Sequence, residues 1–521
     1  MNSITRLETN HSTKSYLERE LIVSIGNDGP MIGPCLEILD THDERAISES
    51  EASTISGQAG ESPKQKERKW WQFYKNSIDD DDPRQYSRLK KNMVLFIVSS
   101  GGLVSPISTT IYFPALVTMQ NYFNTTDTAM NASLSIFTFF TAFFPIIWAT
   151  CGDLYGRRRI YMISFFISVV GSICSALAVN VEMFIVFRAV GAVGSSSAMS
   201  MGAGTIADIF EPQERGRAFA YYTCGPLLGL GWRSNFWFLA IYTFFVWIAM
   251  VFVLPETWRP SPQQPCNVST ETKIGTSATG EKDPENQTQK KKKRKVFNPF
   301  GALNLLRYPN IALTVTFVGV LFFVIYLNNT TFTRTYTIQY GFDSGIVGIC
   351  YLPNATGSMI GGILSGRVSD KIYNKRVQEA NGGKIYPEMR LGGPVFYSAL
   401  IIQLFAFIAY GWCIEKNVHF AYGLVCQFFI GFALMLPNIT LSAYMVDCFK
   451  KQGASVTACN NFARYLMAGI GSLIASDIQR AMNTGPLFTF CGLLLLVAGI
   501  NLIIVKKFAL KWEKLREDSS A

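Results

Sequence analysis

The sequence predicts an all-α polytopic membrane protein, built from two bundles of six helices. Hydrophobic residues make up 49% of the 521 residues and charged residues only 16%, well below the roughly 25% of soluble domains. Twelve apolar segments follow one another, six on each side of a polar loop. A motif of glycine, aspartate and basic residues occurs once in each half, as GDLYGRRR from Gly152 and as GRVSDKIYNKR from Gly366. Such a repeat is typical of proteins built from two related bundles.

Most of the apolar segments reach the ~20 residues that a helix needs to cross ~30 Å of hydrocarbon. In chain order they are 92–117, 129–150, 160–179, 182–207, 216–231, 235–254, 309–328, 344–365, 392–412, 419–444, 456–476 and 486–505. They predict an N-terminal bundle over 89–256 and a C-terminal bundle over 304–508, joined by a basic loop at 257–303. Residues 1–88 are polar and predict a disordered tail, and 509–521 form a second tail.

The basic residues predict how the chain is oriented in the membrane. They gather before the first segment and after the second, fourth, eighth and tenth, for example at Arg157–Arg159. The opposite loops contain only isolated cations such as Arg233, Arg334 and Arg480. Both tails and the loop with Lys290–Lys295 are therefore expected on the cytoplasmic side. In a soluble protein that run of lysines would indicate nuclear import, and the net charge of +10 would suggest nucleic acid. Placed between apolar segments, both indicate topology, and we expect no nucleic-acid partner.

The residues that form most metal and catalytic sites are scarce or scattered. Eleven cysteines are spread along the chain without a CxxC pair, and many lie in apolar segments. Two of the three histidines, His11 and His42, lie in the N-terminal tail, and the third is His419. No nucleophile–base pattern is present either. We therefore expect no metal, no cofactor and no enzymatic activity.

Five sequence blocks, taken as a set, resemble the major facilitator superfamily. They are SPISTTIYFPAL from Ser105, GDLYGRRR from Gly152, the stretch Phe187–Ala218, LPETWR from Leu254 and the stretch Tyr444–Gly471. The resemblance covers about residues 88–508. More narrowly, the blocks resemble those of the fungal twelve-span drug:proton antiporters of the quinidine-resistance and dityrosine type.

The resemblance implies a function. Members of this kind are proton-coupled secondary transporters that export drug-like or small metabolite molecules, of polyamine, dityrosine or organic cation type. The implied partners are a small-molecule substrate, protons and membrane lipids, with the chain acting as a monomer. The implied location is the fungal plasma membrane, with the vacuolar or spore membrane as the alternative.

The resemblance also implies a conformational latch at the repeated motif. In it, Asp153 caps the N-terminus of a neighbouring helix, while Arg157 reaches across the interface between the bundles. The residues assigned to this latch are Asp153, Gly156, Arg157, Arg158, Gly366 and Asp370. The alternative is that the motif serves only topology and folding. Ala149 and Leu154 depart from the family pattern, but the charged residues are kept.

An arginine in the fourth apolar segment is a candidate for proton coupling. An unpaired charge at this depth costs a few kcal/mol, so Arg188 is expected to face the bundle interior. The resemblance assigns proton coupling to Arg188, and Asp208 and Arg464 are further candidates. The alternative is an arginine that reaches the interface, which is stronger for Arg464 than for Arg188. Because no acidic residue lies centrally in segments one, two, seven or eight, the sequence leaves the proton-binding carboxylate unassigned.

Polar residues on otherwise apolar segments are candidates for the substrate cavity. They are Thr109, Tyr112, Asn328, Asn329, Tyr351, Asn354 and Asn438. Hydrogen bonds between helices are an equally good explanation of each. A cavity without a fixed acid favours bulky, weakly polar or amphipathic substrates over a strictly recognised sugar.

The fifth segment is expected to be shortened. Residues 216–231 supply about sixteen residues, or roughly 24 Å of helix, against ~30 Å of hydrocarbon. In the family this span has a long glycine-proline signature, but here CGPLLG from Cys224 runs straight into LGWRSNFWF. An internal deletion or a wrong exon boundary would produce the same sequence. The alternative function is therefore a transport-defective homologue that acts as a sensor or interaction protein.

Overall fold

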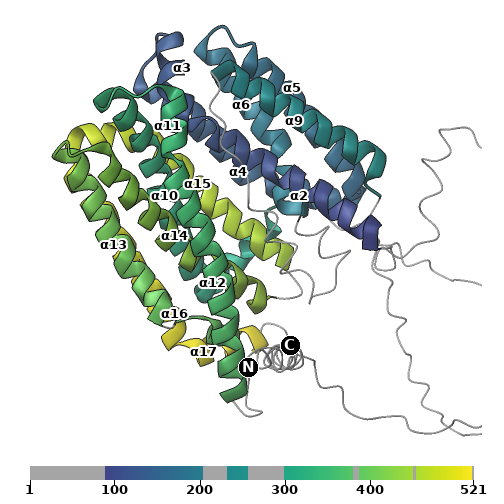
Figure 1. Ribbon diagram of the computed structural model, residues 1–521. Coiled ribbons are helices and arrows are strands. Elements are labelled where there is room, and N and C mark those ends of the chain that lie inside the picture. Colours follow the sequence, from purple (N-terminus) through teal and green to yellow (C-terminus); the bar gives the residue numbers. More distant parts are fainter. Residues whose placement is uncertain are drawn as a thin grey trace, which may run out of the picture. The chain divides into compact units, whose positions relative to one another are not determined.

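The computed structural model describes residues 88–202, 232–255, 299–379, 386–392, 394–449 and 453–518. All of them belong to one compact unit, residues 69–521. Within these ranges the chain forms helices and short connections, with no strand (Figure 1). The predicted all-α fold class is confirmed.

The described helices fall into two groups in the chain. Those of the first half are α2 (Arg88–Thr110), η3 (Phe113–Ala115), α3 (Leu116–Tyr122), α4 (Asp127–Tyr155), α5 (Arg157–Ala176), α6 (Val181–Ser195) and α9 (Trp232–Val253). Those of the second half are η4 (Pro299–Arg307), α10 (Pro309–Arg334), η5 (Thr335–Gln339), α11 (Ser344–Cys350), α12 (Leu352–Glu379), η6 (Pro387–Arg390), α13 (Pro394–Glu415), α14 (Phe420–Cys448), α15 (Gly453–Met482), α16 (Thr484–Lys507) and α17 (Ala509–Asp518).

Ten of the helical stretches in the described ranges are long and apolar enough to cross a membrane. The thirty-residue helix α15 is also long, but polar residues such as Asn460, Asn461 and Arg464 lower its hydropathy. Together these stretches account for eleven of the twelve predicted segments. The fifth segment, 216–231, lies outside the described residues, so its shortening stays a prediction.

One predicted boundary is wrong. The seventh segment was expected to end at 328, which left Arg334 in a loop, but α10 continues to Arg334 and η5 to Gln339. The extra turns are rich in threonine, which lowers their hydropathy without preventing a helix. Thr331 Oγ1 donates to the Leu327 carbonyl at 2.9 Å and Thr333 Oγ1 to that of Asn329 at 3.3 Å. These hydroxyls satisfy their hydrogen bonds inside their own helix.

The ends of several helices follow from single residues. Thr126 caps α4 by accepting a hydrogen bond from the Ala129 amide, and Asn180 caps α6 by accepting one from Met183. Helices also approach closely where side chains are small: a Cβ at Gly171 of α5 would lie 2.5 Å from the backbone nitrogen of Gly191 in α6. Small residues allow such close packing between helices in a membrane.

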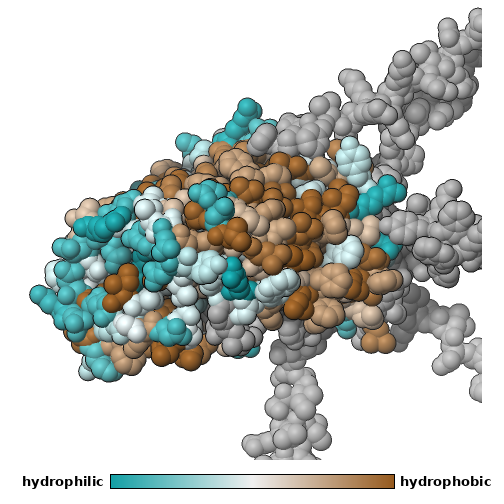
Figure 2. Space-filling view, turned by 90° about the horizontal axis from the view of Figure 1, so that it is seen from above, coloured by the Kyte–Doolittle hydropathy of each residue, from teal (hydrophilic) through white to brown (hydrophobic). Residues whose placement is uncertain are grey.

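The surface of the helices is strongly apolar. Figure 2 shows hydrophobic residues over most of one face, with hydrophilic residues gathered toward one end. Among the exposed large side chains are Phe252 (80% exposed), Phe96 (73%), Phe245 (65%) and Phe405 (64%). A water-soluble protein rarely exposes so many aromatic rings. These side chains therefore face the hydrocarbon of a membrane.

Three buried clusters form the core. One lies within the first half and includes Val98, Phe165 and Met250, and one lies within the second half and includes Val318 and Tyr444. The third and largest joins both halves, with side chains from η3, α3, α4, α6 and α9 packed among those of α10, α13, α15 and α16. Along the middle of the molecule α4 and α15 lie side by side (Figure 1).

Candidate functional site

Two ends of the helical bundle are distinguished below by the residues found there. The Asp127 end is where α4 and α6 begin and where α10 and α15 finish. The Arg157 end is where α4 finishes and α5 begins. By the basic residues of the sequence, the Arg157 end is expected on the cytoplasmic side.

The first copy of the repeated motif forms the turn between α4 and α5. Gly156 alone joins the two helices, with φ +93°, a conformation that strains any residue with a Cβ. Arg158 follows in the first turn of α5 and donates from Nη2 to the Val251 carbonyl of α9 at 2.7 Å. The side chain of Asp153 and all of Asp208 lie outside the described part, so the pairing of Asp153 with Arg157 stays a prediction.

The second copy lies in α12 and is part of an ion-pair network. The Asp370 carboxylate accepts a hydrogen bond from Arg390 Nη1 at 2.6 Å. Arg390 also donates from Nε to the carboxylate of Asp447, at the end of α14, at 2.9 Å. The Arg390 side chain is only 13% exposed. One arginine therefore links η6, α12 and α14. A Cβ at Gly366 would meet nothing within 4 Å, so this glycine is not needed for packing.

Arg376 of α12 holds the connection around η6. Arg376 Nη1 donates to the carbonyls of Met389 and Leu391, at 2.6 and 2.8 Å. Its Nη2 donates to the carbonyl of Gly392 at 3.3 Å. Charge-assisted bonds of this kind are stronger than those between neutral groups, so they fix the connection to α12.

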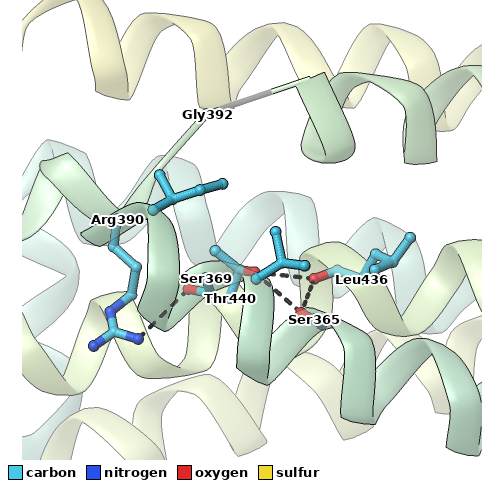
Figure 3. Close-up of a pocket in the computed structure, with 8 residues that line it drawn as sticks. Ser365, Ser369, Arg390, Gly392, Leu436 and Thr440 are labelled. Atoms are coloured by element: carbon cyan, nitrogen blue, oxygen red, sulfur yellow. Dashed lines mark hydrogen bonds between the residues drawn. The ribbon is translucent and has the colours of Figure 1, made fainter. Parts of the chain in front are cut away.

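A small pocket, partly open to solvent, lies beside this network. Figure 3 shows it between α12, α14 and η6, with Arg390 on one side and Ser365 and Thr440 on the other. Ser365 Oγ donates to the Leu436 carbonyl at 2.7 Å and lies 3.1 Å from Thr440 Oγ1. The pocket is confined to the second half and does not lie between the two halves.

Arg188 of α6 is buried among aromatic rings. Its guanidinium carbon lies 4.3 Å from the ring centre of Tyr112, 4.6 Å from that of Phe137 and 5.6 Å from that of Phe236. Arg188 is 2% exposed, and none of its three side-chain nitrogens has a hydrogen-bond acceptor among the described residues. A guanidinium over a ring gains about 0.5–2 kcal/mol. The rings therefore stabilise the cation but leave its N–H groups unused.

Arg464 of α15 lies in a different setting. Its Nη2 donates to Asn438 Oδ1 at 3.1 Å, and its guanidinium carbon lies 4.5 Å from the ring centre of Phe322. Arg464, a candidate for proton coupling, and Asn438, a candidate for the substrate cavity, are thus in contact. The side chain of Tyr326 in α10 lies near both Arg188 and Arg464, so the two arginines lie in the same region of the molecule.

Hydrogen bonds within the protein already occupy polar atoms of most of the remaining candidates for the cavity. Asn328 and Gln427 exchange hydrogen bonds at 3.1 and 3.0 Å, and Asn354 donates to the same Gln427 Oε1 at 3.0 Å. Tyr351 hydroxyl donates to the Asn329 carbonyl at 2.7 Å. Thr109 donates to the Ser105 carbonyl of its own helix, and Tyr112 to the Met130 carbonyl. A role of these residues in binding substrate stays a prediction, and Gln427, the common partner of Asn328 and Asn354, was missed.

The two halves are linked at the Asp127 end by a partly buried ion pair. Arg334 Nη1 of α10 lies 2.8 Å from Asp127 Oδ1 of α4, and the side chains are 5% and 28% exposed. Arg334 also donates to Gln120 Oε1 at 2.7 Å and to Asn131 Oδ1 at 3.2 Å. Nearby, Asn131 donates to Ser476 of α15 at 2.8 Å.

This pair corrects the sequence analysis, in which Arg334 was an isolated cation of a loop. The residues are 207 positions apart in the chain, and nothing in the sequence links them. The available signal was weak: an acid just after the cap of one segment, and an arginine just after the threonine-rich end of another.

Comparison with known proteins places the chain among transporters. Residues 98–472 match the family model described as Major Facilitator Superfamily. The MFS antiporter QDR3 of Candida albicans is 26% identical over 92% of this chain and 87% of its own length. Quinidine resistance protein 3 and Dityrosine transporter 1 of Saccharomyces cerevisiae are 24% and 26% identical, over 83% and 82% of this chain and 84% and 82% of their own lengths.

A solved structure supports the same fold. A bacterial homologue of the human lysosomal transporter Spinster superposes with a TM-score of 0.60 at 16% identity, over 82% of this chain and 99% of that one. The family match covers most of the chain, and the relatives confirm the resemblance to fungal drug:proton antiporters. The chain therefore belongs to the major facilitator superfamily, and it is a multi-pass membrane transporter for small molecules.

Proposed function

We propose that this chain exports drug-like or small metabolite molecules in exchange for protons, as a monomer in the fungal plasma membrane. Relatives named as an antiporter and as a resistance protein support both the direction and the coupling. The polyamine, dityrosine and organic cation classes remain the substrate classes implied by the resemblance.

The observation that carries the proposal is the ion pair between Asp127 and Arg334. A buried ion pair adds little to stability, because removing two charges from water offsets most of their attraction. Permanently joined halves are held better by apolar packing. Charged groups, in contrast, are readily hydrated when an interface opens. A charged contact between the halves, 2.8 Å long, is therefore suited to a transporter that opens and closes at this end.

The basic residues of the sequence indicate which end of the bundle faces the cytoplasm. We place the Arg157 end, with Asp153, Gly156, Arg157 and Arg158, on the cytoplasmic side, where Asp153 and Arg157 latch the outward-open state. The network around Asp370 is its counterpart in the second half. Proton coupling is assigned to Arg188, Asp208 and Arg464. The cavity is assigned to Asn328 and Asn329 of α10, Asn354 of α12 and Asn438 of α14, together with Thr109, Tyr112 and Tyr351.

The proposal is tested by flux through the full chain reconstituted into lipid vesicles. A pH step across the vesicle membrane should drive a substrate from a panel of drugs, polyamines and aromatic metabolites against its gradient. A protonophore should abolish the flux, and vesicles without protein serve as the control. Flux that ignores the pH step contradicts proton coupling, and absence of flux for the whole panel contradicts the transport proposal.

The latch is tested by substitution at the Arg157 end. Asp153→Asn and Arg157→Ala should abolish efflux while the protein still reaches the membrane, because each removes one charge of the proposed latch. Arg159→Ala is the matched control, since Arg159 is exposed at the same turn and has no part in the latch. Wild-type efflux rates in the first two variants would leave the motif with a role in topology alone.

A further inference from the structure

The guanidinium of Arg188 has a capacity for hydrogen bonding that the described residues do not use. Buried polar groups nearly always have partners, and an unpaired buried charge is especially unfavourable. Both Nη atoms of Arg334 have acceptors in Asp127, Gln120 and Asn131, and Arg464 donates from Nη2 to Asn438. Arg188, at 2% exposure, has no acceptor for Nε, Nη1 or Nη2 among the described residues.

The neighbours of Arg188 hold the cation in place without neutralising it. Rings of Tyr112, Phe137, Phe184 and Phe236 lie between 4.3 and 5.9 Å from its guanidinium carbon. The Tyr112 hydroxyl already donates to the Met130 carbonyl, and it lies 2.5 Å from Ser133 Oγ. Tyr112 and Tyr326, the tyrosines near Arg188, are uncharged phenols at neutral pH, and no described carboxylate forms a hydrogen bond with its nitrogens.

The position of this cation is suited to a transported molecule. Arg188 belongs to the first half, whereas Tyr326, which interacts with it, belongs to α10 of the second half. The ring of Tyr326 also lies 5.9 Å from that of Phe113 in η3. The Arg188 region is therefore near the contact between the halves, where alternating access exposes a substrate to each side in turn.

We propose that Arg188 binds the carboxylate of the transported molecule, and that the substrates of this chain are amphipathic carboxylic acids with an aromatic body. This inference rests on the proposed export function. Of the substrate classes named there it favours the dityrosine type, which carries carboxylates, over polyamines and organic cations, and it gives Arg188 a role in substrate binding in addition to proton coupling. A planar guanidinium binds a carboxylate through two parallel hydrogen bonds, and the bonds gain strength where water is excluded. The surrounding rings provide surfaces on which an aromatic body packs. The negative charge that the described residues do not supply then comes from the substrate.

The test compares acids with uncharged and cationic analogues of the same shape. Equilibrium binding to the full chain in lipid nanodiscs is measured for naphthylacetate, indoleacetate and phenylpropionate, and for the amide and the amine of each. We expect the wild-type protein to bind at least one acid about 10- to 100-fold more tightly than its amide, as a charge-assisted pair predicts. Equal affinity for acid and amide, preference for the amine, or no binding of any acid overturns the proposal.

Substitution then assigns the preference to Arg188. Arg188→Gln should remove the acid preference while affinity for the amide is kept, and Arg188→Lys should keep part of it. Arg233→Gln is the matched control, because Arg233 also lies over aromatic rings, 4.8 Å from those of Tyr122 and Trp232, but is at the protein surface. An acid preference that survives in a folded Arg188→Gln protein contradicts the assignment. If that variant fails to fold, the wild-type comparison still decides the substrate class.

Binding in nanodiscs needs no proton gradient, so this proposal and the export proposal fail separately. Acid-selective binding without pH-driven flux would support the Arg188 site and contradict proton-coupled export. Flux of cations driven by the pH step, without acid-selective binding, would do the reverse.

Discussion

At the scale of single residues, arginines explain much of what is unusual in this chain. Each basic side chain inside the bundle requires a partner, because its charge cannot be left in hydrocarbon. Arg334 meets a carboxylate of the other half, and Arg390 meets two carboxylates of its own half. The sequence showed where these arginines are but not what they contact. Partners of this kind are brought together only by the packing of distant helices.

Removing the charge of Asp127 should weaken the closed contact between the halves. Asp127→Asn leaves Arg334 buried with a weaker acceptor, and loss of a partner for a buried charged group costs about 1–3 kcal/mol or more. We expect a lower melting temperature for the purified protein and faster labelling of a cysteine placed at Ser476. Glu379→Gln is the matched control, since Glu379 forms an exposed pair with Lys375 at 3.8 Å, and exposed pairs contribute little.

The charge swap completes this experiment. Asp127→Arg combined with Arg334→Asp should recover part of the stability that each single change loses, because the pair is restored with its partners exchanged. A double variant no more stable than the sum of the two single changes would show that the pair does not couple the halves.

At the scale of elements, the sequence predicted helices far better than their ends. Apolar length identified eleven helices in the described residues, because each must bury its own backbone hydrogen bonds in the membrane. It failed at α10, where threonines lower the hydropathy while bonding back to their own helix. It also predicted the turn at GDLYGRRR without predicting that Gly156 alone would form it.

Gly156 and Gly366, one glycine from each copy of the repeated motif, should therefore differ in their tolerance to alanine. Gly156 has φ +93°, so a Cβ there forces strain of about 1–3 kcal/mol. A Cβ at Gly366 meets nothing within 4 Å, and Gly366 lies inside α12, where alanine favours the helix. Gly156→Ala should lower the melting temperature and the yield, whereas Gly366→Ala should leave both unchanged or raise them. The same loss in both variants would contradict a specific role for the Gly156 turn.

Arg390 should be the residue on which the network in the second half depends. Its removal deprives both Asp370 and Asp447 of their cation, so Arg390→Gln should destabilise the protein more than either Asp370→Asn or Asp447→Asn. Thermal unfolding of the three variants measures this order. Lys375→Gln is the control, because Lys375 pairs with Glu379 at 3.8 Å on an exposed surface. If the melting temperature of Arg390→Gln changes no more than that of this control, the network does not stabilise the protein.

At the scale of the whole molecule, the sequence predicted the architecture but not the contact between the halves. Twelve apolar segments, the repeated motif and the family resemblance led to the fold that the structure and the comparisons confirm. The residues that join the halves, such as Asp127, Arg334 and Ser476, are ordinary in their local sequence. Their role emerges from α4 and α15 lying side by side, and no local pattern specifies that pairing. The sequence therefore predicted Arg188 and Arg464 of the candidate site, but it did not predict the ion pair between Asp127 and Arg334 that joins the halves.

The length of the fifth segment determines whether this span can cross the membrane fully. Only the sequence gives information on it. Residues 216–231 give roughly 24 Å of helix where ~30 Å of hydrocarbon must be crossed. Each missing large apolar side chain forfeits ~1.5–3 kcal/mol of burial, a large share of a typical stability of ~5–15 kcal/mol. We expect low surface abundance or proton leak from the chain as written, and recovery when a family-like glycine-proline segment is inserted after Gly229. The same insert placed in the loop at 257–303 is the control, because it adds the same residues without lengthening the span. Surface abundance and pH-driven efflux are measured for all three chains, and equal performance would show that the short crossing is tolerated.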